Sequence, residues 1–546
     1  MNRKKNSIEA ALRALPTLIL LAAKFALPAF SSSDPPLKLV PADLIIVNAR
    51  IVDGAGNPWY RGSIAVRGDR IEAVGSKLEI GARDTLDAAG LVAAPGFIDI
   101  HNHCDQGLVE NPAAENFVRQ GVTTIVGGPD GESALDLKAY LAGLDTLPLG
   151  LNCCFTVGQG SVREQVLGME DRPPTLAEME RMKALVERAM KDGALGLSTG
   201  LKYVPGAFSS TEEVIELAKV AARFGGYYTS HLREEGPGLI EAVAEAIRIA
   251  AEAGIPVNIT HHKAVGKLMW GKSELTLAMI DSARARGLDV TCDQYPYTAT
   301  STGLRVLFPP WSLAGGSDSL RFRLADPVLK EKISGEIVHA LVYDRGGDDP
   351  LNVVIASCNW NRAHEGKNLK QILDERGVEP TMANTAELVI ELEGSGGAAC
   401  IYHCLQEEDV ERIIRYPAAM VASDGTVLAF GDGVPHPRSY GTFPRVLGIY
   451  VREKGVIGLE EAVRKMTSLP AQRAGLYRRG ILRPGAFADL VLFDPATVAD
   501  RATFLQPHQY PAGIEKVIVN GRLVFDGRAL TEQRPGRVIR RGDENS

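Results

Sequence analysis

The sequence predicts an α/β protein with three parts: a parallel (β/α)8 barrel of the TIM type, a small β-sandwich domain built from both chain ends, and a helical insertion after the seventh barrel strand. Three observations predict this fold. Strand-like apolar runs alternate with helical patterns through the middle of the chain, which is typical of a parallel barrel. Short strand-like pieces separated by turns recur near both ends. One gap between barrel units is too long for a single connection.

The composition excludes several classes of protein. The chain has 546 residues, of which 45% are apolar and 23% charged, so it can bury the core of one large barrel and a smaller domain. The net charge of -7, without a basic cluster, argues against a nucleic-acid binder. Seven cysteines are an odd number in a long chain, so we expect buried thiols and no disulfide framework.

Residues 1–33 are expected to form a leader segment. Basic residues stand at positions 3–5, an apolar stretch runs from Ala14 to Ala23, and small residues follow at 29–33. This order is typical of a secretory signal peptide, so we expect a periplasmic or secreted protein, with a cytoplasmic location as the alternative. No other run approaches the ~20 apolar residues that span a membrane, so no stable membrane span is expected.

The β-sandwich is expected from residues 42–91 and 475–528. The first range contains "DLIIVNARIVDG" and "GSIAVRGDRIEAVG", and the second contains "GAFADLVLFDP" and "KVIVNGRLVFDG". In the last of these, Asn520 and Gly521 separate two apolar runs, which is a strong hairpin signal. Residues 529–546 are polar and are expected to form a tail.

The barrel is expected over residues 92–474. Amphipathic helices separate most of its strands; "STEEVIELAKVAARFG", for example, predicts a helix that Ser210 caps, with Glu213 three residues later. The gap before the eighth strand predicts a helical insertion over about 305–415, where a lid over the site would lie. The expected strands run from Val92 to His103, Thr123 to Gly128, Leu151 to Val157, Ala194 to Thr199, Tyr227 to Leu232, Val257 to His262, Asp289 to Tyr295 and Met420 to Asp424.

Five of these strands end in residues of types that bind metal ions. Active sites of such barrels lie at the carboxyl ends of the strands, so these side chains are expected to face one another. Imidazole and carboxylate suit zinc, and open coordination positions are typical of a catalytic site. The spacing of His101 and His103 places both side chains on one face of a strand. The residues at the five strand ends are His101 and His103, Asp130, His231, His261, and Asp424.

The sequence, including these strand-end residues, resembles the amidohydrolase superfamily, and within it the N-acyl-D-amino-acid deacylases (D-aminoacylases). The resemblance covers nearly the whole chain after residue 42. It implies the same barrel with a β-sandwich, an insertion after strand seven, and zinc at the barrel mouth. The matching segments are "PGFIDIHNH", "GVTTIVGG", "GALGLSTGLKYVPG", "SHLREEG", "ITHHKAVG", "DQYPYTATSTG", "SDG" and "PHPRSYGTFPRVLG".

The resemblance also implies which residues bind metal. His101, His103 and Asp424 match the ligands of one ion, and His231 and His261 match ligands of the other. His262, next in the chain, is expected to point away from the site.

One position departs from the family pattern. Where the best-known deacylases offer a cysteine after the second strand, this chain has Pro129-Asp130-Gly131. A carboxylate can bridge two divalent ions, so Asp130 can restore a two-metal centre. A carbamate on Lys202 is the alternative bridge, and a turn aspartate that binds no metal also stays open for Asp130.

The substrate-binding residues that the resemblance implies are Lys263, Tyr295 and Arg438, which match groups that hold the substrate's α-carboxylate. Arginine offers a bidentate fork to a carboxylate and lysine a point charge, so this assignment is physically reasonable. Tyr203, after the fourth strand, is expected to orient the scissile carbonyl, with plain packing as the alternative.

The implied activity is hydrolysis of N-acyl-D-amino acids to a carboxylate and a free D-amino acid. One or two Zn²⁺ ions would provide an activated hydroxide, with Asp424 as general base and then general acid. The substrate is a small molecule, and a homo-oligomer is left open. Two other enzymes stay as alternatives: a dipeptidase for peptides with a C-terminal D-residue, and a cyclic-amide hydrolase of the hydantoinase or dihydroorotase type. A non-enzymatic assembly module would have lost ligands that this chain retains.

Overall fold

The computed structural model describes residues 41–543, and the expected leader at 1–33 lies outside them. Within this described part, helices and strands alternate along the chain, as expected for an α/β protein. None of the helices described there is both long enough and apolar enough to cross a lipid bilayer. All seven cysteines are buried free thiols, as the sequence predicted.

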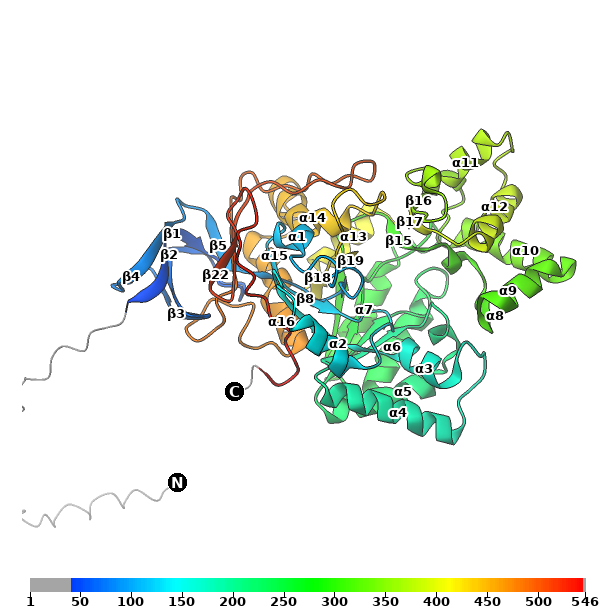
Figure 1. Cartoon of the computed structure of the whole chain (residues 1–546), viewed down its shortest axis with the longest axis horizontal. Coiled ribbons are helices and arrows are strands. Elements are labelled where there is room, and N and C mark those ends of the chain that lie inside the picture. The colour runs from blue at the N-terminus through cyan, green and yellow to red at the C-terminus, as the bar shows by residue number, and fades with distance from the viewer. Residues whose placement is uncertain (1–40, 544–546) are drawn as a thin grey trace, which may run out of the picture. The chain divides into compact units, whose positions relative to one another are not determined.

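One sheet of eight strands combines the two ends of the chain (Figure 1). Its strand order is β22-β21-β20-β5-β1-β2-β3, with β4 paired to β1. The two ends meet where β20 and β5 pair antiparallel, with Leu490 opposite Pro95. The strands are β1 (Ala42–Ile51), β2 (Tyr60–Arg67), β3 (Arg70–Gly75), β4 (Ala82–Asp87), β5 (Val92–Pro95), β20 (Leu490–Phe493), β21 (Ile514–Val519) and β22 (Arg522–Phe525).

The hairpin predicted at Asn520-Gly521 is present. β21 and β22 pair antiparallel, with Val519 opposite Arg522. Asn520 and Gly521 have φ angles of 46° and 77°, the left-handed region that a tight hairpin turn requires and that these two residue types tolerate.

The parallel strands of the barrel region follow one another in chain order. They form a three-stranded sheet, β6-β8-β9, and a six-stranded sheet, β10-β11-β12-β13-β14-β18, and every adjacent pair is parallel. A short parallel pair, β7 with β19, follows β6 and β18. The strands are β6 (Phe97–Asp99), β7 (Asn102–His103), β8 (Val122–Gly127), β9 (Asn152–Phe155), β10 (Val157–Gly158), β11 (Gly196–Gly200), β12 (Tyr227–His231), β13 (Val257–Ile259), β14 (Val290–Gln294), β18 (Ala419–Val421) and β19 (Gly425–Thr426).

The first predicted barrel strand, Val92 to His103, is divided into three. Its first part, β5, belongs to the sheet of the chain ends, and only β6 and β7 pair with the parallel strands β8 and β19. The division falls at Gly96, where a Cβ atom would lie 2.2 Å from the side chain of Thr123. Only glycine permits this close approach, at the point where the chain passes from one sheet to the other.

Helices follow most of the parallel strands, as the alternation predicted. In α5, the Ser210 hydroxyl accepts the Glu213 backbone N–H at 3.2 Å, so the predicted cap is present. Glu213 does not complete the capping box, because its carboxylate pairs with buried Arg163. The helices are α1 (Glu115–Val118), α2 (Leu137–Leu144), α3 (Gln159–Leu167), α4 (Leu176–Lys191), α5 (Thr211–Arg223), α6 (Leu239–Ala253), α7 (Ser273–Ala285), α13 (Glu407–Arg415), α14 (Arg438–Arg445), α15 (Leu459–Met466) and α16 (Ser468–Ala474).

The segment between β14 and β18 is a separate group of elements (Figure 1). The sequence predicted a helical insertion over about 305–415, but the segment also contains a three-stranded sheet, β15-β17-β16, and its own apolar core. The last helix of that range, α13, packs instead against α7, β14 and β18. The inserted elements are β15 (Thr300–Gly303), α8 (Pro310–Leu313), α9 (Gly316–Ala325), α10 (Pro327–Tyr343), β16 (Val353–Ser357), α11 (Leu369–Glu375), α12 (Met382–Gly394) and β17 (Ala399–Tyr402).

The C-terminal segment differs from the polar tail predicted for 529–546. The Cys153 backbone N–H in β9 donates to Arg537 O at 2.9 Å, and the Ile539 N–H donates to Cys153 O at 2.7 Å. Val538 and Ile539 are buried. These two apolar residues inside a charged stretch explain why the segment packs against β9.

Candidate active site

The predicted site residues surround one cavity at the carboxyl ends of the parallel strands. The cavity has a volume of about 840 Å³. His101 lies behind its wall, fully buried, and contacts two of the residues that line it. The other predicted site residues all line the cavity: His103, Asp130, Tyr203, His231, His261, Lys263, Tyr295, Asp424 and Arg438.

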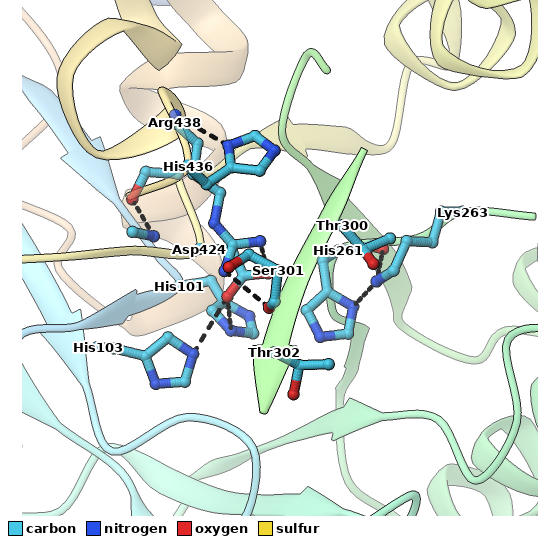
Figure 2. Close-up of polar contacts among 12 residues, drawn as sticks. His101, His103, His261, Lys263, Thr300, Ser301, Thr302, Asp424, His436 and Arg438 are labelled. Atoms are coloured by element: carbon cyan, nitrogen blue, oxygen red, sulfur yellow. Dashed lines mark hydrogen bonds and ion pairs between the residues drawn. The ribbon is translucent and has the colours of Figure 1, made fainter. Parts of the chain in front are cut away.

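Four of these residues form a first group of candidate metal ligands. One ligand atom from each of His101, His103, Asp130 and Asp424 lies within 4.8 Å of the others. His103 Nε2 is 3.1 Å from Asp424 Oδ1, and His101 Nε2 is 3.4 Å from Asp130 Oδ1. Figure 2 shows His101 and His103 on the same side of Asp424. The two histidines therefore converge on one point, as their spacing predicted.

A second group consists of Asp130, His231 and His261, whose ligand atoms also lie within 4.8 Å of one another. Asp130 Oδ2 is 3.4 Å from His231 Nδ1 and 3.6 Å from His261 Nε2. The two histidine nitrogens are 2.8 Å apart. Asp130 belongs to both groups, so its two carboxylate oxygens face two different sets of histidines.

The backbone at three candidate ligands is held in an uncommon conformation. Asp130, His261 and Asp424 have φ angles of 55°, 35° and 51°, and only eight non-glycine residues in the described part of the chain have positive φ. Such conformations cost free energy and are found mainly at functional sites, where the surrounding structure maintains them.

The donor atoms of this site fit a divalent metal ion. Both ring nitrogens of His101, His231 Nε2 and Asp130 Oδ1 are buried and make no hydrogen bond. Burying polar atoms without partners is costly, whereas imidazole nitrogens and carboxylate oxygens are the usual ligands of zinc. Burial raises the pKa of Asp130, but the neighbouring histidines outweigh it and hold this pKa well below its usual value, so the carboxylate is ionised as ligation requires.

The three residues predicted to hold a carboxylate lie together beside the ligands. The Arg438 guanidinium is 4.9 Å from the centre of the Tyr295 ring, and Lys263 Nζ is 5.6 Å from it. Arg438 Nη1 donates to Asp424 Oδ2 at 2.7 Å. The Tyr295 hydroxyl is buried without a hydrogen-bond partner, and burial raises its pKa, so it stays protonated. These groups place on the cavity lining two cations, each also paired with a buried carboxylate, and one hydroxyl without a partner.

Tyr203 is placed where it can contact a substrate. Its ring packs against the ring of His231, with centroids 4.6 Å apart, and its hydroxyl accepts a hydrogen bond from the Thr302 hydroxyl at 3.1 Å. Burial raises the pKa of Tyr203, so its own proton is available for donation into the cavity.

Lys202, the alternative metal bridge, is engaged elsewhere. Its Nζ donates to Glu234 Oε2 at 2.6 Å and to Asp344 Oδ2 at 3.0 Å. Burial lowers its pKa, but the two carboxylates outweigh burial and raise it, so this amine is protonated. A carbamate forms only on a neutral amine, so these two ion pairs oppose a bridging role for Lys202.

Two buried charged residues that the sequence did not single out support the ligands. Glu235 Oε1 lies 3.0 Å from His261 Nδ1 and 2.5 Å from Lys263 Nζ, and Glu235 Oε2 accepts from Arg345 at 2.7 Å. Lys263 Nζ also lies 2.6 Å from His261 Nδ1, so a carboxylate and an ammonium together hold the orientation of this ligand histidine. The only signal for Glu235 was its position four residues after His231, and no local pattern indicated Arg345.

His436 is a third residue that the sequence did not single out. Its Nδ1 accepts the backbone N–H of Arg438 at 3.0 Å (Figure 2). Its Nε2 lies 3.1 Å from Ala299 O, so His436 ties the loop before α14 to the segment that follows β14. His262, in contrast, points toward α7, with Nε2 2.7 Å from the Thr276 hydroxyl, and belongs to neither ligand group.

Comparison with known proteins agrees with this arrangement. Residues 356–525 match the family described as "Amidohydrolase family". The D-aminoacylase of Alcaligenes xylosoxydans xylosoxydans is 38% identical over 524 residues, which cover 92% of this chain and 98% of the relative. The N-acyl-D-glutamate deacylase of the same organism is 36% identical over 521 residues, which cover 91% and 96%.

A solved structure is also similar. The crystal structure of N-acyl-D-glutamate deacylase from Bordetella bronchiseptica, complexed with zinc and a phosphonate inhibitor, matches with a TM-score of 0.79 at 35% identity. The match covers 92% of this chain and 100% of that one. This chain belongs to the N-acyl-D-amino-acid deacylase (D-aminoacylase) family of the amidohydrolases.

Proposed function

We propose that this protein is a zinc-dependent hydrolase that cleaves the amide bond of N-acyl-D-amino acids and releases a carboxylate and a free D-amino acid. The main supporting observation is that two groups of metal-ligand residues, which share Asp130, lie in one cavity wall next to Lys263, Tyr295 and Arg438. The two ligand groups fit a metal that activates water, and Lys263, Tyr295 and Arg438 fit a free α-carboxylate. The relatives named above are deacylases by name.

We further propose that the parallel strands close into one (β/α)8 barrel and that the sheet of the chain ends folds as a β-sandwich. The pairing of β19 with β7 supports closure, because these strands extend the last and the first barrel strands. The Asp424 backbone N–H also donates to His101 O at 2.9 Å. Closure would place ligands from the first and last strands side by side.

The proposed cofactor is one or two Zn²⁺ ions. Zinc supplies Lewis acidity, which lowers the pKa of water from 15.7 to about 7 and polarises a carbonyl oxygen. The ligands would be His101, His103 and Asp424 for one ion and His231 and His261 for the other, with Asp130 shared.

Asp424 is the proposed general base and acid. Burial raises the pKa of Asp424, but Arg438 and His101 outweigh it and lower this pKa, so the carboxylate is ionised and can accept a proton from the attacking water. The protonated carboxyl then returns that proton to the leaving amide nitrogen. Tyr203 can donate its hydroxyl proton to the oxygen of the scissile carbonyl.

The substrate's α-carboxylate would lie against Arg438, Lys263 and the Tyr295 hydroxyl. Fixing the carboxylate and the amide at two separate points leaves the side chain of only one enantiomer free of the cavity wall. A peptide with a C-terminal D-residue presents the same two groups, so a dipeptidase is the second candidate. A cyclic amide has no free carboxylate and would leave the two cations unused.

Incubation of the full-length zinc-loaded protein with racemic N-acetyl-leucine tests the proposal. We expect hydrolysis to stop near half conversion, with D-leucine as the product on chiral chromatography. Glycyl-D-leucine and a hydantoin serve as parallel substrates. Release of L-leucine, or hydrolysis of the hydantoin alone, would contradict the proposed activity, whereas faster cleavage of the dipeptide would favour the second candidate.

Replacing Asp130 by alanine is expected to lower the zinc content from two equivalents to about one. Asp130 is the residue common to both ligand groups, and without it the second group retains only His231 and His261. Metal analysis of the purified proteins by mass spectrometry measures the change. The exposed Asp171 serves as control, because Asp171→Ala should retain two equivalents. Two equivalents in Asp130→Ala would rule out the bridging role.

A further inference from the structure

We propose that the α-carboxylate is the only anionic group of the substrate: neither the side chain nor the acyl group of the preferred N-acyl-D-amino acid carries a second carboxylate. This inference rests on the proposed function and specifies its substrate class. It separates this chain from its N-acyl-D-glutamate deacylase relative, whose named substrate has a second carboxylate.

The part of the cavity beyond the ligands has walls that combine apolar side chains with charged ones, such as Glu132, Lys202 and Arg305. The loop after α3, the segment after β11, and the inserted segment contribute the apolar side chains. A cavity of about 840 Å³ is large enough for a bulky side chain together with an acyl group. The apolar lining residues are Met169, Leu201, Val204, Ala207, Val306, Phe308 and Leu313.

Lys202 is the lining cation nearest in sequence to Tyr203, and two carboxylates neutralise it. Its Nζ is 2.6 Å from Glu234 Oε2 and 3.0 Å from Asp344 Oδ2. The three side chains together have a net negative charge. A second substrate carboxylate would therefore meet repulsion here and not an ion pair.

The other cations in this part of the lining are paired as well. Arg233 Nη2 lies 2.8 Å from Glu245 Oε1, and its Nη groups also donate to two backbone carbonyls. Arg305 Nε lies 2.5 Å from Glu393 Oε1. Each of these guanidinium groups has its own carboxylate, so neither offers a free positive charge.

The remaining cations of the cavity lining, Lys263, Arg345 and Arg438, lie beside the candidate metal ligands and are engaged in other contacts. Arg345 and Lys263 share the buried Glu235, at 2.7 and 2.5 Å. One carboxylate between two cations leaves one positive charge, while Arg438, beside Tyr295, pairs with Asp424 at 2.7 Å. The place proposed for the α-carboxylate lies against that remaining charge and the other N–H groups of Arg438. Among the described residues, no cation of the cavity lining is left for a second substrate carboxylate.

Steady-state kinetics with a set of N-acetyl amino acids tests this inference. The substrates are the N-acetyl derivatives of D-leucine, D-glutamate, D-aspartate and D-lysine, with N-acetyl-L-leucine as reference. We expect kcat/KM for D-leucine to exceed that for the two acidic substrates by about 100-fold or more, because a second carboxylate would be desolvated in the cavity with no unpaired cation among the described lining residues to receive it. D-lysine has no second carboxylate, and the net negative charge around Lys202 does not oppose its ammonium group, so we expect D-lysine not to show the loss seen with the acidic substrates.

A reciprocal variant tests the role of Lys202. The double substitution Glu234→Gln and Asp344→Asn keeps the shapes of both partners but frees the Lys202 ammonium. We expect it to raise kcat/KM for D-glutamate relative to D-leucine by about 10-fold, a gain typical of one new charge-assisted contact. Adding Lys202→Met to the double variant is the matched control and should abolish the gain.

Each result of these two experiments either supports or contradicts the inferred substrate preference. Preference for D-leucine together with a gain that depends on Lys202 supports the inference. Equal or faster hydrolysis of D-glutamate or D-aspartate by the unmodified protein, or a double variant without the gain, overturns it while leaving the deacylase activity in place. Hydrolysis of the L-substrate alone, or of none, overturns the proposed function and the inference with it.

Discussion

Replacing Asp424 by asparagine is expected to lower kcat for N-acyl-D-amino acids by about 1,000-fold or more, because the amide can neither accept the proton of water nor return it to the leaving nitrogen. Asp424 lies at the centre of the polar cluster: its oxygens are 3.1 Å from His103 Nε2 and 2.7 Å from Arg438 Nη1. Its left-handed backbone, with φ of 51°, holds the carboxylate there. Asparagine tolerates that conformation, so the fold should be retained.

Measuring kcat and zinc content in the same preparations separates the loss of the base from the loss of a ligand. Asp432→Asn is the matched control, because Asp432 lies eight residues further on with an exposed side chain that pairs with Arg362 only at 3.4 Å. We expect the control to keep its activity. An Asp424→Asn protein with full zinc content and more than a tenth of the original kcat would exclude Asp424 as the general base.

Arg438→Met is expected to reduce kcat/KM by about 100- to 1,000-fold, since removing one partner of a buried charge pair commonly costs 2–5 kcal/mol. Arg438 is buried, donates to Asp424 Oδ2, and lies over the Tyr295 ring. Its fork is the group in the cavity best suited to hold a carboxylate in a fixed orientation.

Comparing two substrates distinguishes carboxylate binding from support of Asp424. An N-acyl amine without an α-carboxylate should be a slow substrate for the unmodified protein and should lose little more in Arg438→Met. Arg445→Met, at the other end of α14, is the control, because Arg445 pairs with Asp500 and does not line the cavity. A similar loss with both substrates would mean that Arg438 acts through Asp424 alone.

Much of this site was predictable from residue types at the ends of apolar runs. A buried strand that ends in His or Asp signals its position directly, and the five lining residues predicted in this way lie around the same 840 Å³ cavity: His103, Asp130, His231, His261 and Asp424. The other four followed from the resemblance to the deacylase family: Tyr203, Lys263, Tyr295 and Arg438. The cap at Ser210 and the hairpin at Asn520-Gly521 were likewise predictable, because each depends on two or three residues near one another in sequence.

Features that depend on contacts between distant segments were not predictable in this way. Glu235 and Arg345 pair across 110 residues, and each alone resembles a solvated surface charge. The division of the first strand at Gly96 depends on Thr123, which lies in another strand. Ile539 is buried against Cys153 although its neighbours in sequence are charged. In each case the decisive partner lies far along the chain.

A metal-depletion experiment on the full-length protein tests most directly whether the residues at the strand ends form a metal centre that hydrolyses D-configured amides. Hydrolysis of N-acetyl-D-leucine and of its L-enantiomer is measured before chelation, after chelation, and after zinc is added back. His101→Ala serves as the variant lacking one buried ligand. We expect activity on the D-substrate to fall by about 100-fold or more on chelation and to return with zinc, except in the variant. Activity that survives metal removal, or equal hydrolysis of both enantiomers, would contradict the proposal that these residues form a metal centre for D-configured amides.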